Sequence, residues 1–214
     1  MIYDSILFDL DGTLWDSTTG VQKSWAAVAA QHPASPPIPT EADIQGIMGL
    51  TPDDVTAKLF PDLPLGQRRE IFQDCVATEN EYLAMHGGSL YPELTPTLKI
   101  LSQKIPLFIV SNCGVGYIES FLEAHQLHGY FKDWESAGAT GLSKGENIRL
   151  VTTRNHLKQP VYVGDTQSDY DAAQKAQIPF IFAAYGFGFL PANAQAIRIR
   201  QFSDLLNLSF PPTS

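Results

Sequence analysis

Four short and almost continuously apolar runs impose the strongest constraint on how this chain of 214 residues can fold. Each run is followed by polar or glycine-rich residues, and segments with helical spacing lie between the later runs. Such runs are typical of strands buried on both faces of a parallel sheet. The runs cover residues 5–10, 106–110, 160–164 and 179–183. The pattern predicts an α/β fold with a doubly wound parallel sheet, completed by a strand at 197–199 and a terminal helix at 203–208.

The stretch from about residue 15 to residue 87 breaks this alternation, because it contains helical patterns and no convincing strand. Thr51, which precedes a proline and two aspartates, is expected to cap one of the helices. We therefore expect an α-helical domain inserted after the first strand of the core. The expected boundaries are 1–15 and 88–214 for the α/β core domain, and 16–87 for the helical domain.

Charge and composition limit the classes of partner. The chain has 14 Lys and Arg against 23 Asp and Glu, a net charge of −9, which argues against nucleic acid or an anionic membrane surface as partner. No apolar run approaches the ~20 residues that cross a bilayer, so a cytoplasmic protein is expected. Cys75 and Cys113 are expected to be reduced thiols. A monomer and a homodimer both stay open.

Polar side chains follow the predicted strands at the edge of the sheet where open α/β folds bind ligands. Each has an ordinary structural explanation, since Asp-Gly is a common turn and serine or aspartate can cap a helix. Their occurrence together, in order and tied to strand ends, favours a functional site. The candidate residues are Asp9, Asp11, Thr13, Ser111, Asn112, Lys144, Asp165 and Asp169.

These motifs resemble those of the haloacid dehalogenase superfamily, and more narrowly its phosphatases of the phosphoglycolate phosphatase type. Motif one is similar to residues 9–13, motif two to 111–112, motif three to Lys144, and motif four to 164–165 with Asp169. The resemblance covers essentially the whole chain. It implies a Rossmann-like core and identifies the helical insert as a cap that closes over the active site.

A carboxylate such as Asp9 attacks a phosphoester dianion poorly, because like charges repel. Mg²⁺ would answer this problem, since it is a hard cation that takes carboxylate, phosphate and water oxygens. We assign Asp9 and Asp165 as its side-chain ligands, and the resemblance implies the backbone carbonyl of Asp11 as a third. Asp169 is expected to orient metal-bound water or Lys144, and direct coordination by Asp169 stays open.

The departing alkoxide needs an acid, and Asp11 is placed to supply it. Asp11 would protonate the leaving oxygen as Asp9 attacks, and would then activate the water that hydrolyses the aspartyl-phosphate. Ser111, the backbone at Asn112 and Lys144 would stabilise the phosphoryl oxygens. The expected activity is a Mg²⁺-dependent hydrolase acting on a phosphomonoester of a small phosphorylated metabolite.

Several alternatives stay open beside this hydrolase. A phosphosugar mutase of the same superfamily would share all four motifs, although Thr13, which we group with the phosphate-binding residues, favours a phosphatase. A binding protein could retain the fold without turnover. Cys113 could act as a thiol nucleophile with a histidine, but no spacing specifies such a pair. Asp11 argues against removal of halide, because a halide leaves without being protonated.

The leaving part of the substrate is expected to contact residues 46–50, with Trp15 and Ser17 at the first hinge of the cap. This segment is apolar and lacks an arginine, which disfavours phosphoglycolate itself. Residues 145–147 replace a proline-containing segment that is common in relatives, and this departure weakens the transfer of any particular substrate.

Overall fold

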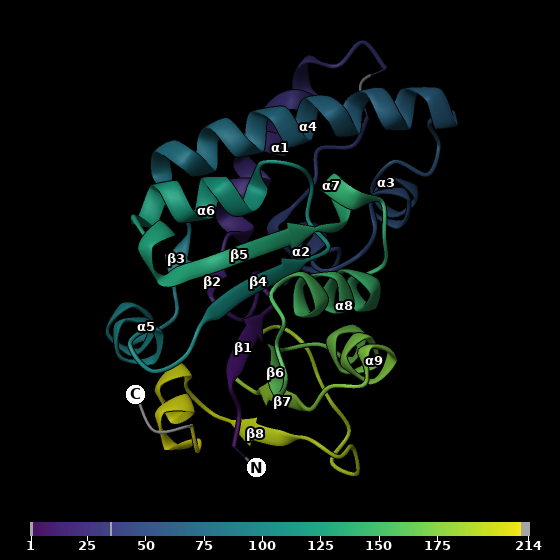
Figure 1. Ribbon diagram of the computed structural model, residues 1–214. Coiled ribbons are helices and arrows are strands. Elements are labelled where there is room, and N and C mark those ends of the chain that lie inside the picture. Colours follow the sequence, from purple (N-terminus) through teal and green to yellow (C-terminus); the bar gives the residue numbers. More distant parts are fainter. Residues whose placement is uncertain (1, 35, 211–214) are drawn as a thin grey trace.

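The computed structural model describes residues 2–34 and 36–210. Within them, six parallel strands form one sheet in the order β5-β4-β1-β6-β7-β8 (Figure 1). These strands are β1 (Ser5–Phe8), β4 (Leu107–Ser111), β5 (Phe131–Ser136), β6 (Pro160–Gly164), β7 (Phe180–Ala183) and β8 (Ile197–Ile199). The predicted doubly wound parallel sheet is confirmed, and β1 lies between β4 and β6 at its centre.

Helices cover both faces of this sheet, which explains why the inner strands β1, β4, β6 and β7 are mainly apolar and fully buried. Ile6 and Phe8 of β1 belong to one buried cluster, which includes residues of α5 (Leu94–Ser102) and α6 (Tyr117–His125). Leu7 points to the other face and packs in a cluster with residues of α8 (Lys144–Arg154) and α9 (Gln167–Ala176). Side chains alternate between the faces of a strand, and here both faces are dry.

Two elements differ from expectation. β5 was not predicted, because charged residues interrupt its apolar ones. It is the edge strand beside β4. Arg154 pairs there with Asp133 at 2.6 Å and with Glu135 at 2.7 Å. An edge strand has a neighbour on one side alone, so it keeps polar side chains that a central strand would exclude. The expected terminal helix is a 3₁₀ helix, η2 (Phe202–Asn207).

The described part of the segment 16–87 is mainly helical, as predicted. Its helices are α1 (Thr18–Gln31), α2 (Glu41–Gln45), α3 (Pro52–Leu59) and α4 (Leu65–His86). Thr51 caps α3 by accepting a hydrogen bond from the backbone N–H of Asp54, with Pro52 in the first turn. In Figure 1, α4 runs along the top of the molecule beside α1 and α6.

The expectation of no strand in this segment was wrong at its first residues. β2 (Trp15–Asp16) pairs antiparallel with β3 (Ser89–Leu90), so two short strands join the beginning of the insert to its end. Sequence patterns do not reveal strands of two residues, because period-two alternation needs at least four residues to register.

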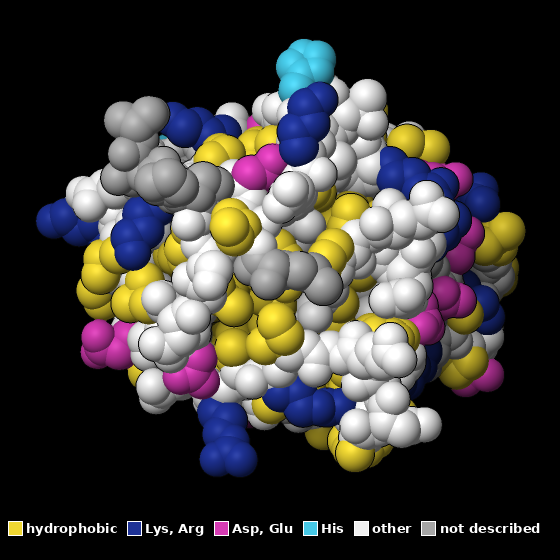
Figure 2. All heavy atoms as spheres, turned by 60° about the horizontal axis from the view of Figure 1, so that its bottom comes forward, with side chains coloured by type: hydrophobic (Ala, Val, Ile, Leu, Met, Phe, Trp, Pro, Cys, Tyr) yellow, Lys and Arg dark blue, Asp and Glu magenta, His cyan; other side chains and the backbone are white. Residues whose placement is uncertain are grey.

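The surface of the described residues carries hydrophobic, basic, acidic and other polar side chains. Figure 2 shows one face, where Lys and Arg side chains stand mostly around the edge and hydrophobic side chains are exposed across the middle. Basic side chains therefore form no continuous stripe on that face. None of the helices in residues 2–34 and 36–210 is both long and apolar enough to cross a membrane.

Candidate active site

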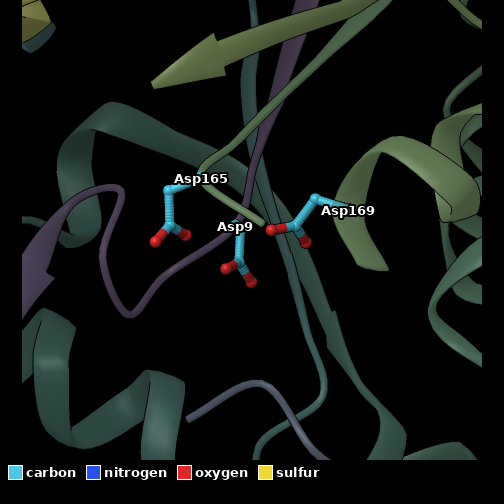
Figure 3. A group of neighbouring side chains, drawn as sticks. All are labelled: Asp9, Asp165 and Asp169. Carbon is cyan, nitrogen blue, oxygen red and sulfur yellow. The ribbon is translucent and has the colours of Figure 1, made fainter. Parts of the chain in front are cut away.

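Three buried carboxylates converge at the carboxyl ends of the central strands. Asp9 follows β1, Asp165 follows β6, and Asp169 lies in the first turn of α9; one side-chain oxygen from each lies within 4.8 Å of the others. In Figure 3, Asp9 and Asp165 point the same way and Asp169 points toward Asp9. β1 and β6 are neighbours in register, which is why the two strand-end aspartates meet.

Lys144 supplies the cation of this cluster. It is the first residue of α8, and its Nζ donates hydrogen bonds to Oδ1 of Asp9 at 2.8 Å and to Oδ1 of Asp169 at 2.6 Å. Burial opposes its charge, but Asp169 and Asp9 outweigh burial and raise the pKa of Lys144. The other oxygen of Asp169 accepts hydrogen bonds from Thr166. Asp169 therefore hydrogen-bonds Lys144, and its role toward a metal ion or metal-bound water stays a prediction.

The cluster holds more negative than positive charge. Burial raises the pKa of Asp9, and the charges of Asp169 and Asp165 add to this effect while Lys144 opposes it. Burial and Asp169 raise the pKa of Asp165 to about 7. These shifts show that the carboxylates lack sufficient compensating charge. Buried carboxylate oxygens short of positive charge are a donor set that fits a hard divalent cation such as Mg²⁺.

The loop after β7 fixes the side chain of Asp165. Backbone N–H groups of Phe187 and Gly188 donate to its Oδ2, at 2.8 Å and 3.2 Å. Gly12, with φ +78°, packs against the same carboxylate, where a Cβ would lie 2.2 Å from Oδ2. Gly12 is thus required twice, for its left-handed backbone and for this close approach. The role of residues 186–188 in holding Asp165 was not predicted from the sequence, although glycines at a strand end were the available signal.

Thr13 lies beside Asp165 rather than in the cavity where phosphate binding was expected. Its side chain is fully buried, and its hydroxyl donates to Oδ1 of Asp165 at 3.4 Å, a long hydrogen bond. Its position is therefore suited to supporting Asp165.

Asp11 is held by two hydroxyl groups that both donate to its Oδ1, Ser17 at 2.7 Å and Tyr117 at 2.9 Å. Burial raises the pKa of Asp11 to about 6, although these two hydrogen bonds oppose the rise. A carboxyl group with this pKa can hold and release a proton near neutral pH. Tyr117, in the first turn of α6, was missed, because its meeting with Asp11 is a long-range contact that no local motif records.

Two residues expected to contact the substrate lie elsewhere. Trp15 is fully buried and packs edge-on against Tyr117 and Phe121, so that expectation was wrong for Trp15. Ser17 is 1% exposed and its hydroxyl is engaged with Asp11 and Tyr117. Trp15 belongs to β2 and Ser17 directly follows it, and both side chains are buried next to Tyr117.

Motif two lies at the end of β4 and faces the same cavity as Asp9. Ser111 and Asn112 both line this cavity, and Nδ2 of Asn112 donates to the carbonyl of Gly49 at 2.9 Å. This bond joins the core to the segment between α2 and α3. Cys113 also lines the cavity, but burial raises the pKa of its thiol, which therefore stays protonated. Such a thiol is a poor nucleophile.

Comparison with known proteins identifies the family. The family model of haloacid dehalogenase-like hydrolases matches residues 6–183 of this chain. The chain belongs to the haloacid dehalogenase-like hydrolases. The matched residues include every candidate site residue named from the sequence, and the resemblance inferred from the motifs is confirmed.

The relatives of this haloacid dehalogenase-like hydrolase include phosphatases. The phosphoglycolate phosphatase of Vibrio vulnificus strain YJ016 is 29% identical over 197 residues, which cover 85% of this chain and 84% of the relative. That of Yersinia pestis is 25% identical over 216 residues, covering 94% and 90%. The crystal structure of a predicted phosphoglycolate phosphatase from Haemophilus somnus shares the fold, with a TM-score of 0.82, 22% identity, and 96% and 97% coverage. The chain is thus an enzyme of a phosphatase-containing hydrolase family.

A cavity lies between the helical segment and the core of this hydrolase. Asp9, Asp11 and Ser111 line it from the core, and mainly apolar side chains line it from α1, α3, α4 and residues 46–50. A second cavity shares Asp9 and Asp11 with the first and extends toward Gly188. Asp9 and Asp11 therefore line both cavities.

One further carboxyl group lines the first cavity. Glu79 of α4 is 5% exposed, and one of its oxygens accepts a hydrogen bond from Nε1 of Trp25 on α1. Burial raises the pKa of Glu79 to about 8; the Trp25 bond opposes this rise and the charge of Asp11 adds to it. The sequence offered no signal for Glu79, because a single acid on a largely polar helix is ordinarily solvated.

Glu79→Gln should flatten the pH dependence of stability. The pKa of Glu79 is about 8 in the folded protein against an ordinary 4.5, so the folded state keeps a proton that the unfolded state releases. Its contribution to the free energy of unfolding is complete below the ordinary pKa and is lost as pH rises through the folded pKa, by about 1.4 kcal/mol per pH unit crossed. Urea unfolding at about pH 6 and about pH 8 measures this loss. Equal losses in the wild type and the variant would contradict the prediction.

Proposed function

We propose that this hydrolase is a Mg²⁺-dependent phosphatase that cleaves a phosphomonoester of a small metabolite through an aspartyl-phosphate on Asp9. The observation that carries the proposal is the convergence of Asp9, Asp165 and Asp169 around Lys144, beside a cavity that also holds Asp11. Related phosphoglycolate phosphatases support the same reaction class. We place the activity in the cytoplasm, which the free thiols of the described cysteines support.

The side chains of Asp9 and Asp165, with the backbone carbonyl of Asp11, would hold Mg²⁺. When bound, the ion supplies positive charge that offsets the carboxylates and polarises the phosphoryl oxygens. Asp165 is held for this role by backbone N–H groups and by Thr13. Asp169 acts through Lys144, since one of its oxygens binds the lysine and the other caps α9.

Asp9 performs the first step by attacking phosphorus, and the bond between phosphorus and the ester oxygen breaks. Asp11 gives its proton to that departing oxygen. Asp11 then takes a proton from a water molecule, whose oxygen attacks phosphorus and releases Asp9 and inorganic phosphate. Ser17 and Tyr117 both bind Oδ1 of Asp11 and so fix the orientation of the carboxyl group for proton transfer.

Groups around Asp9 stabilise the negative charge on the phosphoryl oxygens. Nζ of Lys144 lies 2.8 Å from the nucleophile, so it is placed beside the phosphoryl group as that group is transferred. Ser111 and the backbone N–H of Asn112 line the same cavity and would donate to the remaining oxygens.

We also propose that residues 16–87 form a cap domain over a core of residues 1–15 and 88–214. The position of the first cavity, between the helical segment and the core, supports this division. The pair of strands β2 and β3 joins the two ends of the cap, and the bond from Asn112 to Gly49 crosses from core to cap. A cap in this position excludes water from the phosphoryl transfer.

Removal of the metal should abolish the activity. Purified protein is expected to hydrolyse phenyl phosphate with Mg²⁺, to lose this activity in excess EDTA, and to regain it when Mg²⁺ is added back. In EDTA, Lys144 alone offsets the three carboxylates, and no metal ion polarises the phosphoryl oxygens. Release of inorganic phosphate is the measurement. Activity that persists unchanged in EDTA would contradict the proposal, and phosphate moved between two sugar hydroxyls without release would identify a mutase.

A further inference from the structure

We propose that the cavity beside Asp9 takes the phosphate ester of an uncharged, largely apolar alcohol bearing a second hydroxyl group that binds Glu79, and that it rejects anionic leaving groups such as glycolate. The inference rests on the proposed phosphatase function, and it names the substrate class of that same site. It also makes Glu79 a specificity-determining residue.

The walls of the cavity are apolar on the side away from the reactive carboxylates. Side chains from α1, α4 and the segment between α2 and α3 contribute to them. They include Val21, Trp25, Met48, Leu50, Phe72 and Val76. Walls of this kind favour an apolar leaving group over a polar one.

No lysine, arginine or histidine among the described residues lines this cavity. Lys144 binds Asp9 and Asp169, so its charge is committed to the phosphoryl end of the substrate. Besides Asp9, the carboxyl groups that line this cavity are those of Asp11 and Glu79. A carboxylate on the leaving group would lose its hydration without gaining a cation, and it would face acidic neighbours. An uncharged leaving group avoids both costs.

Glu79 is the polar feature of this apolar wall. One oxygen accepts the hydrogen bond of Trp25, and within the described part of the chain its other oxygen makes no hydrogen bond. Among the described residues, this oxygen is not one of the fully buried polar atoms that lack a partner, so it is accessible from the cavity that Glu79 lines, where a ligand hydroxyl can bind it. Burial raises the pKa of Glu79, so the group is mainly neutral near pH 7 and pairs with a hydroxyl as donor or acceptor. A site of this kind discriminates strongly against a ligand that lacks the hydroxyl.

Three para-substituted aryl phosphates test the inference: phenyl phosphate, its para-hydroxymethyl derivative and its para-carboxy derivative. We expect kcat/KM for the hydroxymethyl ester to exceed that for phenyl phosphate by at least about tenfold, and the carboxy ester to fall below phenyl phosphate by a similar factor. Carboxy and phenyl esters cleaved equally well, or no gain from the hydroxymethyl group, would overturn the inference while leaving the phosphatase intact. No Mg²⁺-dependent cleavage of any ester would instead contradict the proposed function.

Variants of Glu79 separate recognition from support of the fold. Glu79→Leu should reduce the ratio of hydroxymethyl to phenyl kcat/KM toward one, whereas Glu79→Gln keeps a hydrogen-bonding group and should keep most of the ratio. Glu81→Gln, an exposed acid on the same helix, is the matched control and should leave the ratio unchanged. An equal loss on all three esters in Glu79→Leu would show that Glu79 merely anchors Trp25, and would overturn its assignment. If Glu79→Leu does not fold, the wild-type ratios and Glu79→Gln still decide.

Discussion

Asp9→Asn is expected to abolish phosphatase turnover, with a fall in kcat of at least about 10⁴-fold. The amide is close in size to the carboxylate but is not a nucleophile toward phosphorus. Lys144 keeps its hydrogen bond to Asp169, so the cluster retains an ion pair and the fold should persist. Phosphate release under saturating Mg²⁺, together with a thermal unfolding curve, measures both effects.

Asp171→Asn is the matched control for this change. Asp171 is exposed on α9, bonded to Gln167 and outside the carboxylate cluster, so its loss should change kcat less than about twofold. If Asp9→Asn retained activity comparable to that of the control, Asp9 would not be the nucleophile.

Lys144→Met should destabilise the protein strongly as well as inactivate it. Lys144 is 4% exposed and ion-paired with Asp9 and Asp169, so its removal leaves buried carboxylates without their cation. Breaking one partner of a buried ion pair costs about 3–5 kcal/mol, a large part of the stability of a domain. Urea unfolding near neutral pH, in EDTA so that no metal replaces the lost charge, measures the difference.

Lys175→Met provides the comparison on the surface. Lys175 pairs with Glu146 at 3.7 Å and both side chains are about half exposed, so the pair should contribute no more than about 1 kcal/mol. The destabilisation by Lys144→Met should also shrink in mild acid, because burial already raises the pKa values of Asp9 and Asp165 and these groups then take up protons. Equal effects of the two lysine variants would show that the cluster tolerates its charge without Lys144.

The central strands and the carboxylate cluster could be predicted from the sequence, because local pattern and topology coincide there. The runs that became β1, β4 and β6 are apolar on both faces, and parallel strands place their carboxyl ends at one edge. Asp9 and Asp165 follow two neighbouring strands, so their meeting follows from the strand order.

The remaining parts of the site depend on contacts that no local pattern records. Tyr117 reaches Asp11 across 106 positions of sequence, and Phe187 reaches Asp165 across 22. Glu79 becomes significant solely because α4 lies over the cavity. The prediction that Trp15 contacts the substrate was wrong for the converse reason. Its place beside motif one suggested the active site, whereas packing against α6 buries it.

Trapping the covalent intermediate tests the central claim most directly. Enzyme turning over saturating phenyl phosphate with Mg²⁺ would be quenched in acid and treated with borohydride, which reduces an acyl phosphate to an alcohol. Peptide mass analysis should then find homoserine at position 9, and only where both substrate and Mg²⁺ were present. Unmodified Asp9 in an enzyme that is turning over, or reduction at Asp11 instead, would contradict an account in which Asp9 carries the phosphoryl group.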